Sequence, residues 1–403
     1  MAMIGRAFAQ EQHLRYFFWG GPARAANRQA AVDKFVAEKG SISASVEWAG
    51  WDDYWPRLNT QLAGGNPPDL IQMDFSRIEE FASRGTLLEL DAYIPGTLQI
   101  AGFGDKRLAS GKIGGKTYGI TGGDNSQAMF YDVAAWDEVG VAPTNLMSWN
   151  DFRSVCEQFK AKTSRNNVVA TPNRGGGSNE LEVWMRQRGK SLYNGKALGF
   201  ELADLVEWFD FWQAMTNDGL AATGEIQGLQ QASAEGALMT QGLAAISFGW
   251  SNDLVAYAAL TPNQIGMLTI PGSDTRPGQF IKPSQFLSVG AKSPNAELAV
   301  ALINFLLMDP EAVKIQKLDV GVPPDVAVRE ALLPSLNPIE QQIVGYLGEA
   351  EKAAGNLPPP PPPGAGEVAL MLNDVNTEIM FGLSPADGAQ KVMDQAAAIL
   401  ARA

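Results

Sequence analysis

Short apolar runs alternate with amphipathic helical patterns over the first fifth of the chain, and this alternation restricts the fold more than any other feature. The expected strands cover residues 14–18, 43–48 and 69–73, and the expected helices cover residues 23–38, 52–63 and 76–83. Strand–helix–strand order indicates a parallel sheet covered by helices on both faces. In such sheets ligands bind at the carboxyl ends of the strands.

The same kind of alternation returns further along the chain. Helices are expected at residues 148–162, 179–188, 202–217, 296–308 and 384–403, and strands at residues 167–171, 244–248, 264–268 and 286–289. Because 403 residues exceed what one hydrophobic core usually supports, we expect two α/β domains, each with a mainly parallel sheet flanked by helices. Six consecutive prolines at 358–363 predict a stiff loop within the fold, because a helical pattern resumes after them.

Composition removes several classes of function. The formal net charge of −13 without a Lys/Arg cluster excludes nucleic-acid binding and favours a self-repelling monomer. The chain has one cysteine, Cys156, and one histidine, His13, so it can form no internal disulfide, Cys/His metal cluster or histidine-based triad. We therefore expect no metal and no cofactor. Cys156 lies in an amphipathic helical pattern and is expected to be a core thiol.

The first twelve residues form a separate segment. Ala7-Phe8-Ala9 is a small-x-small pattern typical of a signal-peptidase site, and polar residues follow it. A residual export signal and an unstructured tag are the two interpretations. No apolar run in the sequence reaches the roughly 18 residues that span a bilayer.

Several motifs then occur in an order that matches a known family. They are Trp19-Gly20-Gly21, Gly50-Trp51-Asp52-Asp53-Tyr54, residues 58–70, 114–120, 129–132 and 248–252, Ser293-Pro294-Asn295, Phe305-Leu306-Leu307 and Gly321-Val322-Pro323. In this number and order they resemble the extracellular solute-binding proteins of carbohydrate importers, the group that includes maltose-binding protein. The most specific is the block at 58–70, where Pro67-Pro68-Asp69 precedes an apolar strand.

The resemblance implies a fold of two α/β lobes that close on a ligand by a hinge. Crossings between the lobes would fall near Thr121, Ser284 and Pro323. Lobe 1 would comprise residues 13–121 and 285–323, and lobe 2 residues 122–284 and 324–403. The resemblance also implies a periplasmic protein that binds a mono- or oligosaccharide without chemistry and delivers it to the permease subunits of an ABC importer.

Candidate ligand-binding residues follow from what a sugar presents. Aromatic rings cover its C–H faces, and charged or amide groups bond its hydroxyls. The expected site residues are Trp19, Arg24, Trp51, Asp74, Asp124, Asn125, Glu180, Trp184, Trp250, Lys282 and Ser284. Among them Trp250, at the end of an expected strand, is the preferred stacking platform. Trp48, Trp208 and Trp212 are instead expected to pack in the interior.

Three alternatives stay open. A glycoside hydrolase or lyase would need paired carboxylates, for which Asp52-Asp53, Glu79-Glu80 and Asp124 are the candidates. A binder of peptides or another non-sugar solute would share the fold without the sugar. Arg24, Arg174, Arg188 and Lys282 also leave an acidic or modified sugar open.

Overall fold

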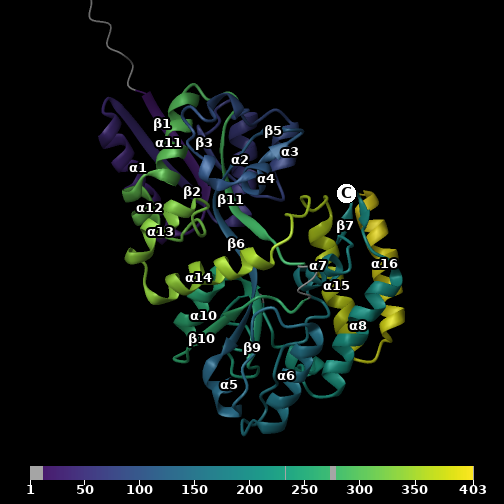
Figure 1. Cartoon of the computed structure of the whole chain (residues 1–403). Coiled ribbons are helices and arrows are strands. Elements are labelled where there is room, and N and C mark those ends of the chain that lie inside the picture. The colour runs from purple at the N-terminus through teal and green to yellow at the C-terminus, as the bar shows by residue number, and fades with distance from the viewer. Residues whose placement is uncertain (1–11, 232, 273–277, 403) are drawn as a thin grey trace, which may run out of the picture. The chain divides into compact units, whose positions relative to one another are not determined.

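The computed structural model describes residues 12–231, 233–272 and 278–402, which form two compact units (Figure 1). Unit 1 contains the described residues up to Asp124 together with Pro283–Leu336, and unit 2 contains Asn125–Lys282 and the chain from Asn337 onward. The chain thus passes between the units three times, after residues 124, 282 and 336. Nearly all of the predicted signal segment, residues 1–12, lies outside the described residues.

Unit 1 is an α/β layer structure around β1. Its elements are β1 (Gln12–Trp19), α1 (Pro22–Lys39), β2 (Ile42–Ala49), α2 (Trp51–Ala63), β3 (Leu70–Met73), α3 (Ile78–Ser83), α4 (Asp105–Ser110), β4 (Lys112–Ile113), β5 (Lys116–Thr117), the start of β6 (Ile120–Asp132), β11 (Ile281–Val289), α11 (Ala296–Met308), α12 (Pro310–Gln316) and α13 (Val326–Leu332). Strand β1 pairs in parallel with β2 and with β3, as the alternation of the sequence predicts. Strand β11 pairs with β3 in the antiparallel direction.

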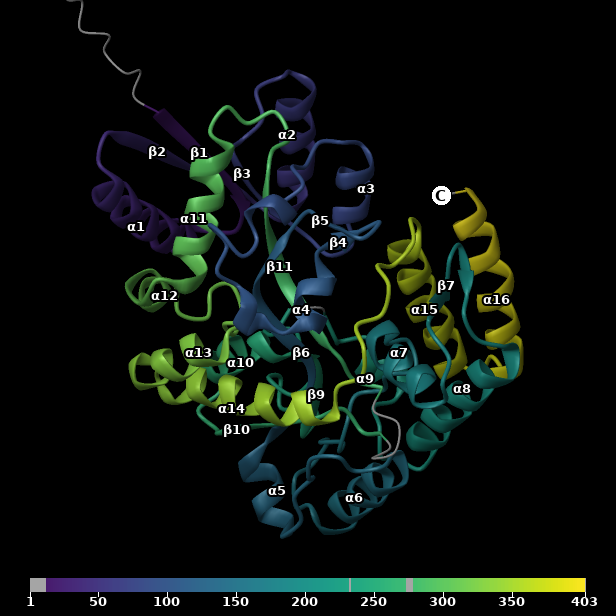
Figure 2. The same cartoon turned by 45° about the horizontal axis from the view of Figure 1, so that its top comes forward.

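Side-chain alternation along β1 builds the core of unit 1. Leu14, Tyr16 and Phe18 are buried on one face of the sheet together with Val32 and Phe35 of α1. Helices α1 and α2 lie close to the β1–β2 pair (Figure 2). Strand β2 is at the edge of the sheet. For that reason the expectation for Trp48 is wrong, since this ring on β2 is 40% exposed.

Unit 2 is richer in helices. Its elements are the rest of β6, α5 (Val133–Val139), α6 (Trp149–Lys162), α7 (Ser178–Gln187), β7 (Tyr193–Asn194), β8 (Ala197–Leu198), α8 (Leu202–Asn217), α9 (Gly224–Gln227), β9 (Ile246–Trp250), α10 (Leu254–Leu260), β10 (Ile265–Leu268), the first residues of β11, α14 (Pro338–Ala353), α15 (Ala365–Met380) and α16 (Pro385–Arg402). Helices α15 and α16 run beside α8 (Figure 1). The six prolines connect α14 to α15 as a loop, as predicted.

The α/β fold is confirmed, but the strands of unit 2 pair differently from the prediction. Both β9 and β10 are antiparallel to β6. The expected strand at 167–171 is reduced to two isolated parallel bridges, Val169 with Ala244 and Thr171 with Ala221. Periodicity identifies a buried strand but not its direction, which here is set by the entry of β6 into the unit. Cys156 is fully buried, and burial raises the pKa of its thiol far above the ordinary value.

None of the helices that the structure describes combines the length and the apolar character needed to cross a bilayer.

Candidate functional site

In unit 1 the carboxyl ends of three neighbouring parallel strands bring predicted residues together. Strand β1 ends at Trp19, which is in register with Ala49 at the end of β2, and β3 ends just before Asp74. Because parallel strands end at the same edge of a sheet, these positions share one edge. This is the edge where the sequence predicts ligand binding.

Four aromatic side chains at this edge form what we name the tryptophan cluster: Trp19, Trp51, Tyr54 and Trp55. The ring centroids of Trp19 and Trp51 are 5.2 Å apart and perpendicular, and Trp55 lies 5.3 Å from Trp51. Tyr54 and Trp55 are buried, whereas Trp51 is 44% exposed and Trp19 is half-buried. The exposed Trp51 ring therefore packs against Trp19 and the buried Trp55, and its exposed part is available to stack on an apolar ligand face.

The polar candidates of unit 1 have differing surroundings. Asp74 accepts hydrogen bonds from the main chain and the hydroxyl of Ser76, at 2.8 and 2.6 Å, and so fixes the turn into α3. Asp124 is buried and forms an ion pair with Arg107. Ser284 donates its hydroxyl to the Val320 carbonyl. These contacts give the three side chains structural partners of their own.

Gly123 allows two backbone segments of unit 1 to approach each other closely. A Cβ built on Gly123 would lie 2.1 Å from the Val320 carbonyl oxygen, an impossible contact. The glycine thus allows strand β6 to pass close to the backbone at residues 320–322, where Asp124 bridges to Val322.

Arg24 extends from the first turn of α1 at the same strand end. Its Cδ would be 2.9 Å from a Cβ built on Gly20, so the side chain lies along the Gly20-Gly21 turn. Burial, and then the charge of Arg28, lower the pKa of Arg24, while Asp319 and Tyr16 act in the opposite direction.

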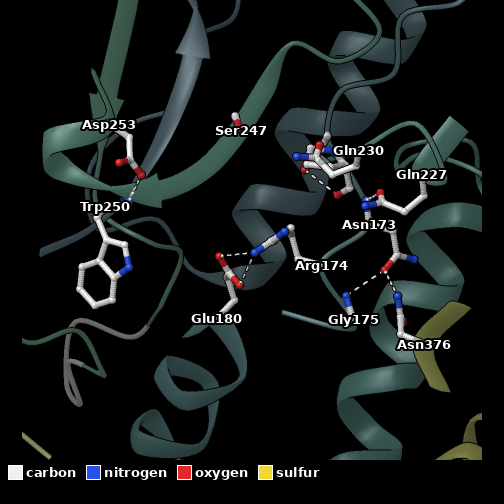
Figure 3. A network of polar contacts seen from close by, with 12 residues as sticks. Asn173, Arg174, Gly175, Glu180, Gln227, Gln230, Ser247, Trp250, Asp253 and Asn376 are labelled. Atoms are coloured by element: carbon white, nitrogen blue, oxygen red, sulfur yellow. Dashed lines mark hydrogen bonds and ion pairs between the residues drawn. The ribbon is translucent and has the colours of Figure 1, made fainter. Parts of the chain in front are cut away.

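In unit 2 the strand-end aromatic residue is Trp250, at the end of β9 (Figure 3). Its main-chain N–H donates to Asp253 at 2.8 Å, and burial raises the pKa of that carboxyl. The indole ring points away from Asp253 and is half-buried (Figure 3). The Lys282 ammonium lies 5.0 Å from the ring centroid, a cation–π distance, and Phe280 is 6.3 Å away.

Two charged residues of α7, Glu182 close to Lys282 and Arg186 close to Phe280, were missed by the sequence reasoning. Burial raises the pKa of Glu182 to about 7, although the charges of Arg186 and Lys282 lower it. Arg186 donates to the Gly278 carbonyl at 2.6 Å and lies 5.1 Å from the Phe280 ring. The spacing of four residues between Glu182 and Arg186 on α7 was the available signal, because it places both on one helix face.

Other candidates of unit 2 occupy packing positions. Glu180 is buried and pairs with Arg174 through both carboxylate oxygens, at 2.9 and 3.1 Å (Figure 3). Trp184 is 3% exposed in the core, and the Arg188 guanidinium lies 3.5 Å from its ring centroid. The ring is therefore engaged mainly in packing. Asn125 is half-buried and accepts a long hydrogen bond of 3.5 Å from Ser251.

Unit 2 also has a hollow with a volume of about 790 Å³. Its lining includes Trp149, Trp184, Arg188, Glu207 and Phe211 from α6, α7 and α8. Of the predicted site residues only Trp184 contributes to it. Over the described part of the chain, no group of three or more His, Cys, Asp or Glu side chains could hold a metal ion.

Together, the two-unit α/β fold and the strand-end aromatic and charged side chains define a ligand-binding protein. The chain belongs to the bacterial extracellular solute-binding proteins, since the model of that family matches residues 30–330. Membership in this family means that the protein binds a solute outside the cytoplasm.

Individual relatives agree with this assignment. A protein of Brucella abortus named as a binding protein is 23% identical over 335 residues, which are 79% of this chain and 75% of the relative. The structure of a family 1 extracellular solute-binding protein from Alicyclobacillus acidocaldarius is 29% identical, with a TM-score of 0.85 over 96% of this chain and 98% of that one.

More distant structures share the fold. A periplasmic oligogalacturonide binding protein from Yersinia enterocolitica is 22% identical, with a TM-score of 0.80 over 97% of this chain and 99% of that one. The sugar-binding protein MalE from Xanthomonas citri is 17% identical, with a TM-score of 0.80 over 97% and 98% of the two chains.

Proposed function

We propose that this protein captures a mono- or oligosaccharide in the periplasm and delivers it to the permease of an ABC importer. The family supports a solute-binding role, and several structural neighbours are named for the sugars that they bind. The inference that the ligand is a sugar rests on two aromatic surfaces at strand ends, which are the tryptophan cluster of unit 1 and Trp250 of unit 2.

The two surfaces fit a sugar for a physical reason. A sugar ring has an apolar C–H face that packs on an indole, and a rim of hydroxyls that needs donors and acceptors. In unit 2 these are Lys282, which lies over the Trp250 ring, and Glu182 and Arg186 of α7. In unit 1 they are Arg24 and Asp74, which follow the ends of β1 and β3 at the edge that carries the tryptophan cluster. A partly protonated carboxyl such as Glu182 can both donate to and accept from a hydroxyl.

A glycoside hydrolase remains the competing function. It would need two carboxyl groups about 5 to 10 Å apart across the scissile bond. Two of its candidates already have cationic partners, because Asp124 pairs with Arg107 and Glu80 lies 3.0 Å from Arg84. The proposal therefore favours binding without turnover.

The test is a thermal-shift screen of the purified protein against neutral sugars, uronic acids, oligosaccharides, peptides and amino acids. A rise of several degrees with one carbohydrate group, with the sugar recovered intact by mass spectrometry, supports the proposal. A response only to peptides or amino acids would contradict it. Consumption of the sugar would instead support the glycoside hydrolase.

A further inference from the structure

Two arginines one helical turn apart on α1 form, with nearby residues, an uncommon basic cluster in unit 1. Arg24 and Arg28 both approach the end of β1, and the Arg28 guanidinium carbon lies 5.8 Å from the ring centroids of Tyr16 and Phe18. We name Arg24, Arg28, Tyr16 and Asp319 the basic cluster. All four belong to unit 1.

Arg28 is almost wholly buried, with 1% of its surface exposed. Its Nη1 donates to the side-chain oxygen of Gln316, but its Nε and Nη2 find no hydrogen-bond partner among the described residues. The hydroxyl of Tyr16 is buried and equally without a partner there. Because buried polar groups are nearly always paired, these donors leave the cluster short of hydrogen-bond acceptors among the described residues.

Arg24 is the member of the cluster that can reach a ligand. It is half-buried, and no hydrogen bond or ion pair within the described ranges engages its guanidinium. Asp319 contributes the cluster's one carboxylate, and that group accepts a hydrogen bond of 2.6 Å from Asn27. The cluster therefore carries two positive charges against one negative charge, in a protein whose net charge is −13.

The start of α1 adds to this local field. Gly21 is the N-cap, it provides no side-chain cap, and the first turn contains no acidic residue. The first turn of α1 thus supplies no counter-charge of its own, and the two arginines outweigh the single carboxylate of Asp319, which favours an external anion near Arg24.

We infer that Arg24 binds a carboxylate of the ligand, so that the sugar contains at least one uronic acid unit. The inference rests on the proposed function and gives its substrate class. The planar guanidinium matches a carboxylate with two parallel hydrogen bonds, a geometry that Lys cannot reproduce. Because the protein as a whole is anionic, the ligand is a short acidic sugar rather than a long polyanion.

Calorimetric titration of the full chain with three matched disaccharides tests the inference: digalacturonic acid, its dimethyl ester and the neutral galactose disaccharide. We expect the acid to bind at least tenfold more tightly than either neutral form. Arg24→Gln should remove this preference, Arg24→Lys should restore part of it, and Arg84→Gln, an exposed control that removes the same charge, should leave it unchanged.

A second readout separates ligand binding from a structural role of Arg24. Since Arg28 repels Arg24, the melting temperature of unliganded Arg24→Gln should equal or exceed that of the natural sequence. A lower melting temperature, or an acid preference that survives in Arg24→Gln, would overturn the inference. Equal affinity for the acid and neutral sugars would overturn it while leaving the proposed function intact, whereas binding of no sugar at all would overturn both.

Discussion

Both units collect tryptophans, but at different kinds of position. In unit 1, Trp19 and Trp51 lie where a strand ends and a helix begins, and Trp51 remains 44% exposed. In unit 2, Trp208 and Trp212 lie on one face of α8 and are fully buried. The number of tryptophans therefore does not indicate a sugar site. The element on which each one lies separates candidates for stacking from core residues.

The charged groups near the two surfaces also differ. Unit 1 has the Arg24 guanidinium at its strand ends, where Arg28 adds a second positive charge, and unit 2 has Glu182, whose pKa burial raises to about 7. If both surfaces bind the ligand as proposed, the unit 1 surface suits a negative group and the Glu182 carboxyl a neutral hydroxyl. Four substitutions test this comparison.

The largest effect is expected from the helical tryptophans. Trp208→Ala would leave a cavity in the core of unit 2 and remove the hydrogen bond of 2.7 Å that its indole donates to the Gly175 carbonyl. We expect unfolding of unit 2 to become easier by about 3 to 5 kcal/mol, measured by chemical denaturation. Trp208→Phe should recover part of this loss. A change below about 1 kcal/mol would mean that the two kinds of tryptophan do not differ as described.

The next largest effect is expected at Trp250, which lies at the end of β9 and is half-buried. Trp250→Ala should weaken binding of the sugar identified by the thermal screen by about 10- to 100-fold, or roughly 1.4 to 2.7 kcal/mol, because a stacking face is lost. Trp250→Phe should keep most of the affinity. Calorimetric titration provides the measurement, and unchanged affinity in Trp250→Ala would assign the ring to packing alone.

The same distinction shows how far the sequence predicts this molecule. The order of strands and helices in unit 1 follows from periodicity, because clear helical patterns separate β1, β2 and β3 and follow β3. Trp250 and Trp19 were correctly placed at strand ends. Trp184 was expected to line a ligand site but is buried in the core. One face of α7 is apolar, and the sequence does not say which neighbours cover it.

Long-range contacts explain the remaining misses. Nothing near Asp124 in the sequence indicates its ion pair with Arg107, which comes from a helix 17 residues earlier. The raised pKa of Glu182 depends on burial beneath segments that are distant in the chain. The antiparallel direction of β9 and β10 likewise follows from how the chain returns, which periodicity does not encode.

A smaller, pH-dependent effect is expected from Glu182. Its pKa of about 7 in the folded protein exceeds the ordinary 4.5, so the folded state binds the proton more tightly and stability falls as pH rises between these values. Glu182→Gln should therefore raise the free energy of unfolding by about 1 to 2 kcal/mol near pH 8 and change it little near pH 4.

Denaturation at both pH values measures this effect. Glu207→Gln is the control: it removes an exposed carboxylate that pairs with Arg188 at 2.7 Å, so it should not raise the free energy of unfolding near pH 8. A gain from Glu182→Gln that is equal at both pH values would mean that ionisation of Glu182 does not cause it.

The smallest effect on stability is expected at Trp51, and here the chain offers a close control. Trp48 and Trp51 are similarly exposed, at 40% and 44%, but only Trp51 belongs to the tryptophan cluster. Each alanine variant should lower the free energy of unfolding by less than about 1 kcal/mol, because both rings lie at the surface and water can fill the space that a truncated ring leaves. Only Trp51→Ala should weaken sugar binding, by a few-fold, since the remaining rings of the cluster keep part of the surface. Equal affinity in the two variants, measured by titration, would show that membership of the tryptophan cluster gives Trp51 no part in sugar binding.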